Sequence, residues 1–370
     1  MGEPAFDTPV GIREAAVRAL AAGDTRYTPR LGFPELREAV RVRLARDKGF
    51  HPAFEDAVIT AGGSPAACIS IAATCQSGDT IVVPDPAWPN YDLFAARIGV
   101  GVRRYRYSAS RELDLEEIDS LIDATTKLLI INSPANPTGA VATKEEMASL
   151  VELAARRTVW ILSDEAYEGI VFDGERAWSP CALGGSDRTF AAYTFSKTYA
   201  MTGWRVGYLI IPSEFRRAAL ELQATMTGCA PSMAQRGAEH ALRHCDEEAE
   251  TMRRVHELRR NLALSQLDGS GIVDGTPRGA FYLWLSIERS GMTGQRFADW
   301  IWRQAGVRVS AGEVYSRAEP HHVRASFATD ERSLGAGLGR IQSALDSLAD
   351  GEAPPSGDQR RQRSHCGGGG

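Results

Sequence analysis

The chain has 370 residues, which is more than one compact core usually holds, so its length predicts a larger and a smaller domain. Hydrophobic residues make up 43% and charged residues 24%, and this composition excludes disorder over the whole chain. The net charge of −5 gives no reason to expect nucleic acid as a partner, and no apolar run reaches the ~20 residues of a membrane span. Six cysteines without a C-x-x-C pair, and a start without a signal-peptide pattern, predict free thiols in the cytoplasm.

Strand-like and helix-like segments alternate over the first two thirds of the chain. Amphipathic helices are predicted at 33–48, at about 65–74 and at 144–157. Buried strands are predicted at 57–60, 80–84, 127–132, 158–164, 189–195 and 206–212. This alternation predicts an α/β fold, with a mostly parallel sheet in the large domain and helices on both of its faces.

The character changes from about residue 229. A long helical pattern comes first and should contain a connecting helix; strands at 279–287, 306–310 and 321–328 and helices near 294–305 and 331–348 then predict a smaller α+β domain. We therefore divide the chain into an N-terminal segment (1–30), a large domain (31–255) and a small domain (256–349). The tail, 350–370, is poor in apolar residues and is predicted to be disordered.

Polar and aromatic residues gather where the predicted strands end. These positions hold Gly62-Gly63-Ser64-Pro65, Trp88, Asn136-Pro137, Asp164 with Tyr167, and Ser196-Lys197. Because ligands of open α/β sheets bind at the carboxyl ends of the strands, we expect these residues to line one cleft.

The Gly62–Pro65 turn joins a predicted strand to a predicted helix. Ser64 suits the N-cap and Pro65 the first helical position, and free backbone N–H groups there can bind a phosphate. The alternative is a tight turn that binds nothing. Taken alone, the motif favours that alternative, since it matches neither the Walker loop nor the dinucleotide fingerprint.

The chain has only four lysines, at positions 48, 127, 144 and 197. Lys48 and Lys144 lie on charged helical segments and are predicted to be solvated. Lys197 lies at a strand end among serine, glycine and aromatic residues, where burial and a cation such as Arg205 lower an amine pKa. It is therefore a candidate for Schiff-base chemistry, the alternative being a loop lysine near a structural arginine.

Asp164 ends an apolar strand, where a carboxylate can hold a protonated ring nitrogen; the alternative is a helix N-cap. Trp88 can stack on a planar ring; the alternative is core packing. Together these groups fit pyridoxal phosphate. That molecule needs a lysine for its aldehyde, a carboxylate for its pyridine nitrogen, an aromatic side chain against its ring, donors for its phenolate oxygen and backbone N–H groups for its phosphate.

Eight motifs then stand in the order of one family: GEPAFDTP, YTPRLGFPELREAV, ITAGGSPAA, PDPAWPNY, NSPANPTG, SDEAYEGIVFDG, SKTYAMTGWRVGY and VRASFA. Over Gly2 to about Leu348 the chain resembles the class I/II, aspartate-aminotransferase-like enzymes that depend on pyridoxal phosphate. The resemblance implies the fold-type-I architecture and a homodimer with shared active sites. It also implies transfer of an amino group between an L-α-amino acid and a 2-oxo acid by a ping-pong mechanism.

The resemblance also implies roles for individual residues. Lys197 would bind the cofactor aldehyde and shuttle the substrate proton, Asp164 would partner the ring nitrogen, and Tyr167 would donate to the ring's phenolate oxygen together with Asn136. The remaining implied contacts are Trp88 as the stacking aromatic; Gly63, Ser64, Thr194 and Arg205 as the phosphate cup; Tyr27 on the phosphate of the neighbouring subunit; and Arg324, Asn136 and Gly2 on the substrate. Asn136-Pro137 is expected to be a cis peptide.

Two departures leave the substrate side chain open. The chain begins at the GEP motif, before which family members usually carry a further segment, so we expect an open cleft and Gly2 on a frayed terminus. The loop SAGEVYS at 310–316 also differs from the family's Pro-Gly pattern. A nonproteinogenic, guanidino (arginine-derived, enduracididine-like) amino acid of antibiotic biosynthesis is our substrate hypothesis.

Other activities share this scaffold, and a lyase or an oxidase that uses the same cofactor stays open as an alternative. A cofactor-sensing regulator is less favoured, because no basic recognition helix is visible. Gly335-x-Gly337-x-Gly339 lies in a helical pattern, and His321-His322 has no partner ligands at helical spacing. We therefore predict neither a dinucleotide site nor a metal site.

Overall fold

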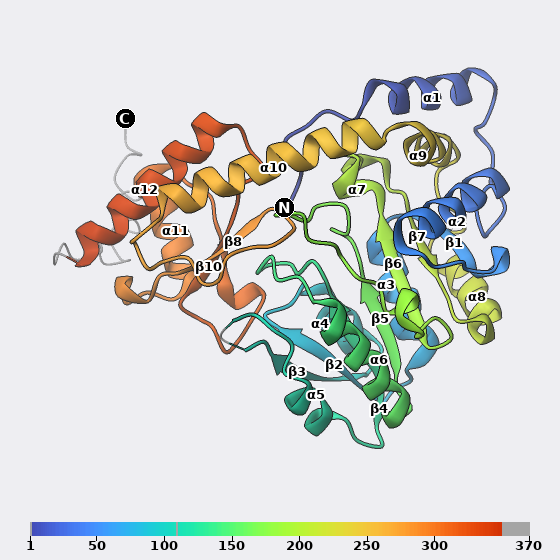
Figure 1. Ribbon diagram of the computed structural model, residues 1–370, viewed down its shortest axis with the longest axis horizontal. Helices are drawn as coiled ribbons and strands as arrows, with labels where there is room; N and C mark the ends of the chain where they lie inside the picture. Colours follow the sequence, from blue (N-terminus) through green and yellow to red (C-terminus); the bar gives the residue numbers. More distant parts are fainter. Residues whose placement is uncertain (1, 109, 350–370) are drawn as a thin grey trace, which may run out of the picture.

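The computed structural model describes residues 2–108 and 110–349, so the predicted disordered tail at 350–370 lies outside the described residues. Seven strands form the main sheet, in the order β1-β7-β6-β5-β4-β2-β3 (Figure 1). Their bounds are Ala57–Thr60 (β1), Thr80–Asp85 (β2), Gly101–Arg106 (β3), Thr126–Asn132 (β4), Trp160–Asp164 (β5), Thr189–Thr194 (β6) and Gly207–Ile210 (β7). β7 runs antiparallel to both neighbours and the other pairs are parallel, so the predicted mostly parallel sheet is confirmed.

Helices cover both faces of this sheet. On one face α3 (Gly63–Thr74), α4 (Asn90–Arg97) and α8 (Arg216–Met226) bury Ile69, Tyr91 and Ala219. On the other face α5 (Leu115–Leu121) and α6 (Lys144–Arg157) bury Ile118 and Leu150. The central strands are apolar on both sides, as sheets with two covered faces require.

A third core lies beside β1, β6 and β7, where α2 (Pro34–Lys48) and α9 (Ser232–His244) pack on the sheet. The first helix, α1 (Val10–Ala21), lies against α9 (Figure 1). Strand β3 was not predicted, because its sequence GVRRYR carries three arginines. It is one of the two edge strands of the sheet, where such side chains reach solvent.

The predicted α+β part of the chain has its own small antiparallel sheet, in the order β8-β10-β9. Its elements are α10 (Asp246–Gln266), β8 (Tyr282–Ser286), α11 (Gly294–Ala305), β9 (Ser310–Ala311), β10 (His322–Ser326) and α12 (Glu331–Ala349). The long α10 runs from α9 to this sheet without a break (Figure 1). The boundary that we predict at 255/256 therefore falls inside one helix, and the domain division stays a prediction.

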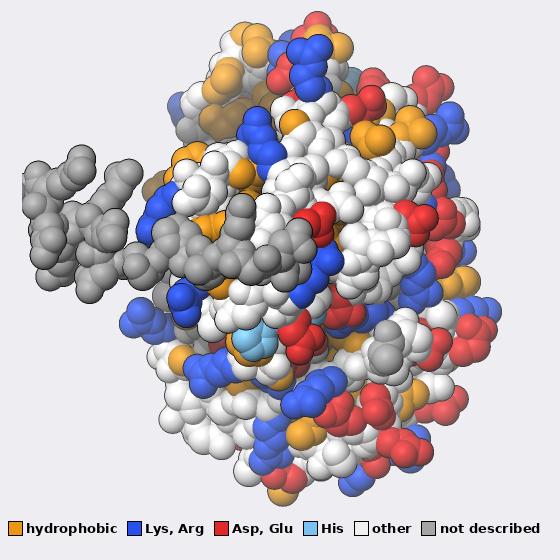
Figure 2. All heavy atoms as spheres, turned by 90° about the vertical axis from the view of Figure 1, so that its left-hand side faces the viewer, with side chains coloured by type: hydrophobic (Ala, Val, Ile, Leu, Met, Phe, Trp, Pro, Cys, Tyr) orange, Lys and Arg blue, Asp and Glu red, His pale blue; other side chains and the backbone are white. Residues whose placement is uncertain are grey.

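Short helical turns complete the chain: α7 (Phe195–Thr198) and the 3₁₀ turns Phe54–Asp56, Pro180–Leu183, Thr202–Trp204, Ser213–Phe215, Glu288–Ser290 and Gly312–Val314. Among the described helices, none combines the length and apolarity needed to cross a membrane. On the side of the molecule shown in Figure 2, basic and acidic side chains lie interspersed.

Candidate active site

The carboxyl ends of the parallel strands meet at one edge of the main sheet and bring most of the predicted residues together. Asp164 is the last residue of β5 and lies beside Asn132 at the end of β4. Lys197 lies in α7, directly after β6. Because β7 is antiparallel, its first residue, Gly207, pairs with Thr60 at the end of β1 and with Thr194 at the end of β6. Arg205 therefore reaches the same edge.

Lys197 points into this cluster. Its Nζ donates to the carbonyl of Gly2 at 2.5 Å and lies 5.8 Å from the centre of the Tyr167 ring. Burial lowers the pKa of Lys197 to about 8, with help from the cation Arg324 and against the opposing charge of Glu3. The share of neutral amine near physiological pH is therefore far larger than in an ordinary lysine, as a nucleophile or general base requires.

Asp164 is held by two donors. The hydroxyl of Tyr91 donates to its Oδ2 at 2.5 Å, and the backbone N–H of Ala166 donates to its Oδ1 at 3.2 Å. Burial raises the pKa of Asp164, while the Tyr91 hydrogen bond acts in the opposite direction. A cation at this carboxylate would relieve the cost of burying it, so the position suits a protonated ring nitrogen.

Arg324, on β10, is a buried cation at 8% exposure. It makes no ion pair with any described carboxylate, and its Nε has no partner there. Its Nη1 donates to Oδ1 of Asn136 at 2.9 Å, and Asn132 accepts from the Asn136 backbone N–H. A buried guanidinium without a counter-charge fits a substrate carboxylate. The Asn136-Pro137 peptide is cis, as predicted.

The turn after β1 forms an anion cradle. Gly62 has φ +103°, and a Cβ there would lie 2.7 Å from Nη2 of Arg205. The Cβ and methyl group of Thr194 lie across from Gly63, and its hydroxyl donates to the hydroxyl of Ser196 at 2.9 Å. Backbone N–H groups, two hydroxyls and a guanidinium form a donor set that fits a phosphate.

Our N-cap prediction was wrong. Gly62 is the N-cap, and α3 begins at Gly63, so Ser64 and Pro65 are its second and third residues. The left-handed φ of Gly62 turns the chain sharply out of β1, and the helix therefore starts two residues earlier than the Ser-Pro pair suggests.

The structure places the three remaining predicted residues differently. Trp88 packs edge-on against Tyr91, with ring centroids 5.3 Å apart. Tyr27 is 96% exposed, and its predicted role stays a prediction. Gly2 is half-buried against Lys197 and Tyr282, so the expectation that it lies on a frayed terminus was wrong.

Sequence reasoning missed three contacts. Tyr91 supports Asp164 and stands three residues after Trp88 in the same motif, which was a usable signal. Asn132 orients Asn136 from the end of β4. Tyr282 pairs its hydroxyl with that of Tyr167 at 2.9 Å, but in GAFYLWLSI it reads as one more buried strand residue.

Lys48 was predicted to be solvated, and this prediction was also wrong. The side chain is 7% exposed, and its Nζ lies 3.1 Å from Glu168 and 3.9 Å from Glu165. It also donates to the carbonyl of Ala177. Because α2 packs against the sheet beside these residues, Lys48 on its last turn is buried and forms an ion pair in the interior.

A cluster of possible metal ligands surrounds His322: its Nε2 lies 2.9 Å from Asp274, and Glu319 is close by. Asp274 comes from a distant loop and left no local signal, whereas Glu319 stands three residues before His322 and was overlooked in the sequence. However, Arg111 forms an ion pair with Asp274 at 2.5 Å, and Trp284 donates to Glu319. The guanidinium of Arg111 therefore already balances the charge of these carboxylates, and we assign no metal to the cluster.

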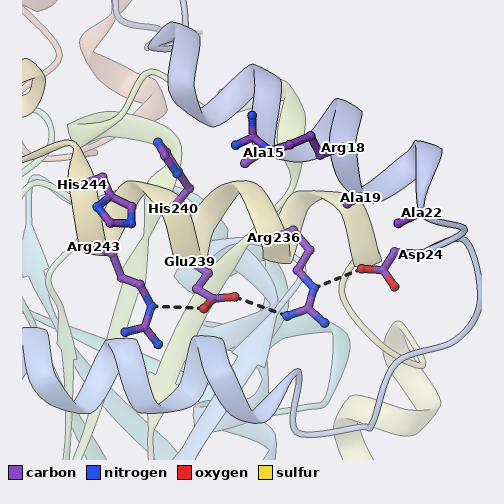
Figure 3. A pocket seen from close by; sticks show the side chains of 10 residues that line it. All are labelled: Ala15, Arg18, Ala19, Ala22, Asp24, Arg236, Glu239, His240, Arg243 and His244. Carbon is purple, nitrogen blue, oxygen red and sulfur yellow. Dashed lines mark hydrogen bonds and ion pairs between the residues drawn. The ribbon is translucent and has the colours of Figure 1, made fainter.

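A hollow separate from Lys197 lies between α1 and α9 (Figure 3). Arg236 bridges Asp24 and Glu239 there, and Arg243 also bonds Glu239. A cavity of about 590 Å³ adjoins Arg205 instead, lined by Glu3, Phe6 and Trp204 among others. The residues with catalytic chemistry thus gather at the sheet edge and not between α1 and α9.

The model of the family described as aminotransferase class I and II matches residues 1–341. An aspartate aminotransferase of Pyrococcus horikoshii is 34% identical over 94% of this chain and 90% of its own length. An aspartate/prephenate aminotransferase of Cereibacter sphaeroides is 35% identical over the same shares. The crystal structure of an aromatic aminotransferase from Pyrococcus horikoshii superposes with a TM-score of 0.90 at 31% identity, covering 94% of each chain.

Proposed function

The chain belongs to the class I and II aminotransferases and is a transaminase, and we propose that it exchanges the amino group of an L-α-amino acid with a 2-oxo acid by a ping-pong mechanism. Pyridoxal phosphate is its expected cofactor. The observation that carries the proposal is the arrangement of Lys197, with a pKa lowered to about 8, beside Asp164 and the unpaired Arg324.

When bound, pyridoxal phosphate supplies an aldehyde that joins amines and a ring that withdraws electrons from the substrate Cα. Asp164 would hold the protonated ring nitrogen. Tyr167 and Asn136 would donate to the phenolate oxygen, and Trp88 would cover one ring face. The cradle of Gly63, Ser64, Thr194 and Arg205 would bind the phosphate.

Lys197 and Arg324 then divide the work on the substrate. The guanidinium of Arg324 would bind the α-carboxylate through two parallel hydrogen bonds, which fixes the direction of the Cα–H bond. The neutral Nζ of Lys197 would accept the Cα proton and hold it beside the site of its release. Burial supports this role, since a solvated lysine stays protonated at neutral pH.

We further propose a homodimer with shared active sites. The almost fully exposed Tyr27 supports this proposal, together with Val10, Val17 and Leu20, which leave apolar surface exposed on α1. Contiguous exposed apolar surface can mark a protein–protein contact. A cytoplasmic location stays a prediction.

For the substrate, the relatives' names point to aspartate, prephenate and aromatic amino acids. We propose testing aspartate and the aromatic amino acids first as amino donors, and prephenate as a 2-oxo acid acceptor. The guanidino amino acid and the link to antibiotic biosynthesis remain hypotheses from the sequence, and no described contact adds to them.

The test follows the absorbance of the cofactor-loaded protein while single amino acids are added. Conversion to the pyridoxamine form, reversed by a 2-oxo acid, is the expected result. Release of ammonia, or consumption of oxygen, would favour the lyase or oxidase alternative. Lys197→Ala should abolish turnover, and substantial residual transamination would contradict the assignment of Lys197.

A further inference from the structure

Tyr282, on β8, touches two residues of the proposed site with two different parts of its side chain. Its hydroxyl lies 2.9 Å from the hydroxyl of Tyr167. Its ring faces the guanidinium of Arg324, which lies 4.2 Å from the ring centre. The side chain is 1% exposed, so neither contact competes with solvent.

We propose that Tyr282 is a positioning residue that connects the carboxylate clamp, Arg324, to the cofactor-facing hydroxyl of Tyr167. The proposal rests on the proposed function, since it requires a cofactor oxygen in front of Tyr167.

Proton counting sets the direction of the hydroxyl pair. Each hydroxyl has one proton to donate. If Tyr167 donates to the cofactor's phenolate oxygen, its oxygen must accept from Tyr282. A hydroxyl that accepts one hydrogen bond becomes a stronger donor in the next. Tyr282 would thus stabilise the phenolate through Tyr167.

The ring has a separate task. The guanidinium of Arg324 lies over the rings of both Tyr282 and Tyr315, 4.2 Å and 4.9 Å from their centres. In a stacked cation–π contact the aromatic ring lies against a face of the planar guanidinium. The N–H groups point outward in the plane of the guanidinium and can still donate hydrogen bonds. Two N–H groups of Arg324 can therefore meet a carboxylate without loss of the aromatic contacts.

Tyr282 also joins two parts of the fold. It pairs with Ser326 on β10, the strand that holds Arg324, whereas Tyr167 follows β5 of the main sheet. The substrate clamp and the cofactor-facing hydroxyl therefore meet at one side chain.

The experiment uses the cofactor-loaded protein and two variants at this position. Tyr282→Phe removes only the hydroxyl, and the pH midpoint of the absorbance of the Lys197-linked cofactor should rise by about 0.3 unit. Tyr282→Leu also removes the ring, and the affinity for the nonreactive carboxylates succinate and 3-phenylpropionate should fall about threefold to tenfold. Tyr282→Phe should retain that affinity.

Tyr208→Phe is the matched control, because it removes a buried hydroxyl from β7 in the core beside α2 and α9. It should move neither readout. An unchanged midpoint in Tyr282→Phe, alongside a raised midpoint in Tyr167→Phe, would overturn the hydroxyl link. Equal carboxylate affinity in Tyr282→Leu and the wild type, with both folded by circular dichroism, would overturn the ring's role. If the wild-type protein forms no Lys197-dependent absorbance, the proposed function itself fails.

Discussion

Replacing Lys48 by methionine tests the interior ion pair behind β5. The perturbation keeps most of the side-chain volume and removes the charge that lies 3.1 Å from Glu168 and 3.9 Å from Glu165. Glu165 is 1% exposed, and its Oε2 has no hydrogen-bond partner among the described residues. Loss of the cation therefore leaves a buried carboxylate without its counter-charge.

Breaking a buried pair from one side costs about 3–5 kcal/mol. For a chain of this length, that range lowers Tm by about 4–7 °C. We expect Lys48→Met to shift the thermal melt, followed by circular dichroism at pH 8, by that amount. Lys144→Met is the control: Lys144 is exposed, its Nζ lies over the Trp178 ring, and its loss should cost less than about 0.5 kcal/mol.

The pH dependence gives the sharper test. Burial raises the pKa of Glu165, and Lys48 opposes this rise. Without Lys48 the pKa of Glu165 in the folded state rises further above its value in the unfolded state. Between these two pKa values the folded state binds more protons than the unfolded state, so the stability of the protein falls as pH rises. The cost of Lys48→Met should thus shrink toward low pH. A melt shift equal to that of Lys144→Met, or one independent of pH, would refute the reasoning.

Three further predictions concern the cluster at the sheet edge. Tyr91→Phe removes the 2.5 Å hydrogen bond to Asp164, so the carboxyl pKa of Asp164 should rise. The Kd of pyridoxal phosphate, measured by equilibrium dialysis, should increase about fivefold to tenfold. An unchanged Kd would contradict the conclusion that Tyr91 supports Asp164. Arg324→Lys keeps the charge but loses the planar fork, so KM for the amino acid should rise about tenfold to 100-fold in steady-state assays, and an unaltered KM would place the carboxylate elsewhere. In the cofactor-free protein, trinitrobenzenesulfonate should label Lys197 faster as pH rises, because the neutral amine reacts, with a midpoint at about 8; a midpoint near that of an ordinary lysine would refute the burial argument.

Local patterns predicted much of the fold. The apolar strands of the main sheet and helices such as α6 and α11 lie close to their predicted bounds, because periodicity reports which face is buried. The prediction missed β3 because an edge strand can carry Arg103 and Arg104 and therefore shows no apolar periodicity.

At the candidate site, strand ends indicated Lys197, Asp164 and Arg205 because short motifs follow each strand. Lys48 and Tyr282 could not be found this way. Lys48 is buried by residues more than a hundred positions away, and Tyr282 reaches Tyr167 from a different sheet. Partners so distant in sequence leave no local pattern for either residue.

The position of β7 has a consequence for the order of events during synthesis. Among the described strands, β1 pairs only with β7, so the glycine turn that follows β1 has no neighbour in the sheet until residues near 210 are made. Lys197 and Arg205 stand on the connection between β6 and β7 and emerge together. The proposed phosphate cradle is thus completed by a long-range contact, which forms slowly compared with local ones. A nascent chain that ends before β7 should therefore be unable to retain the cofactor. The cofactor should bind only after β7 has paired with β1 and β6 in the main sheet.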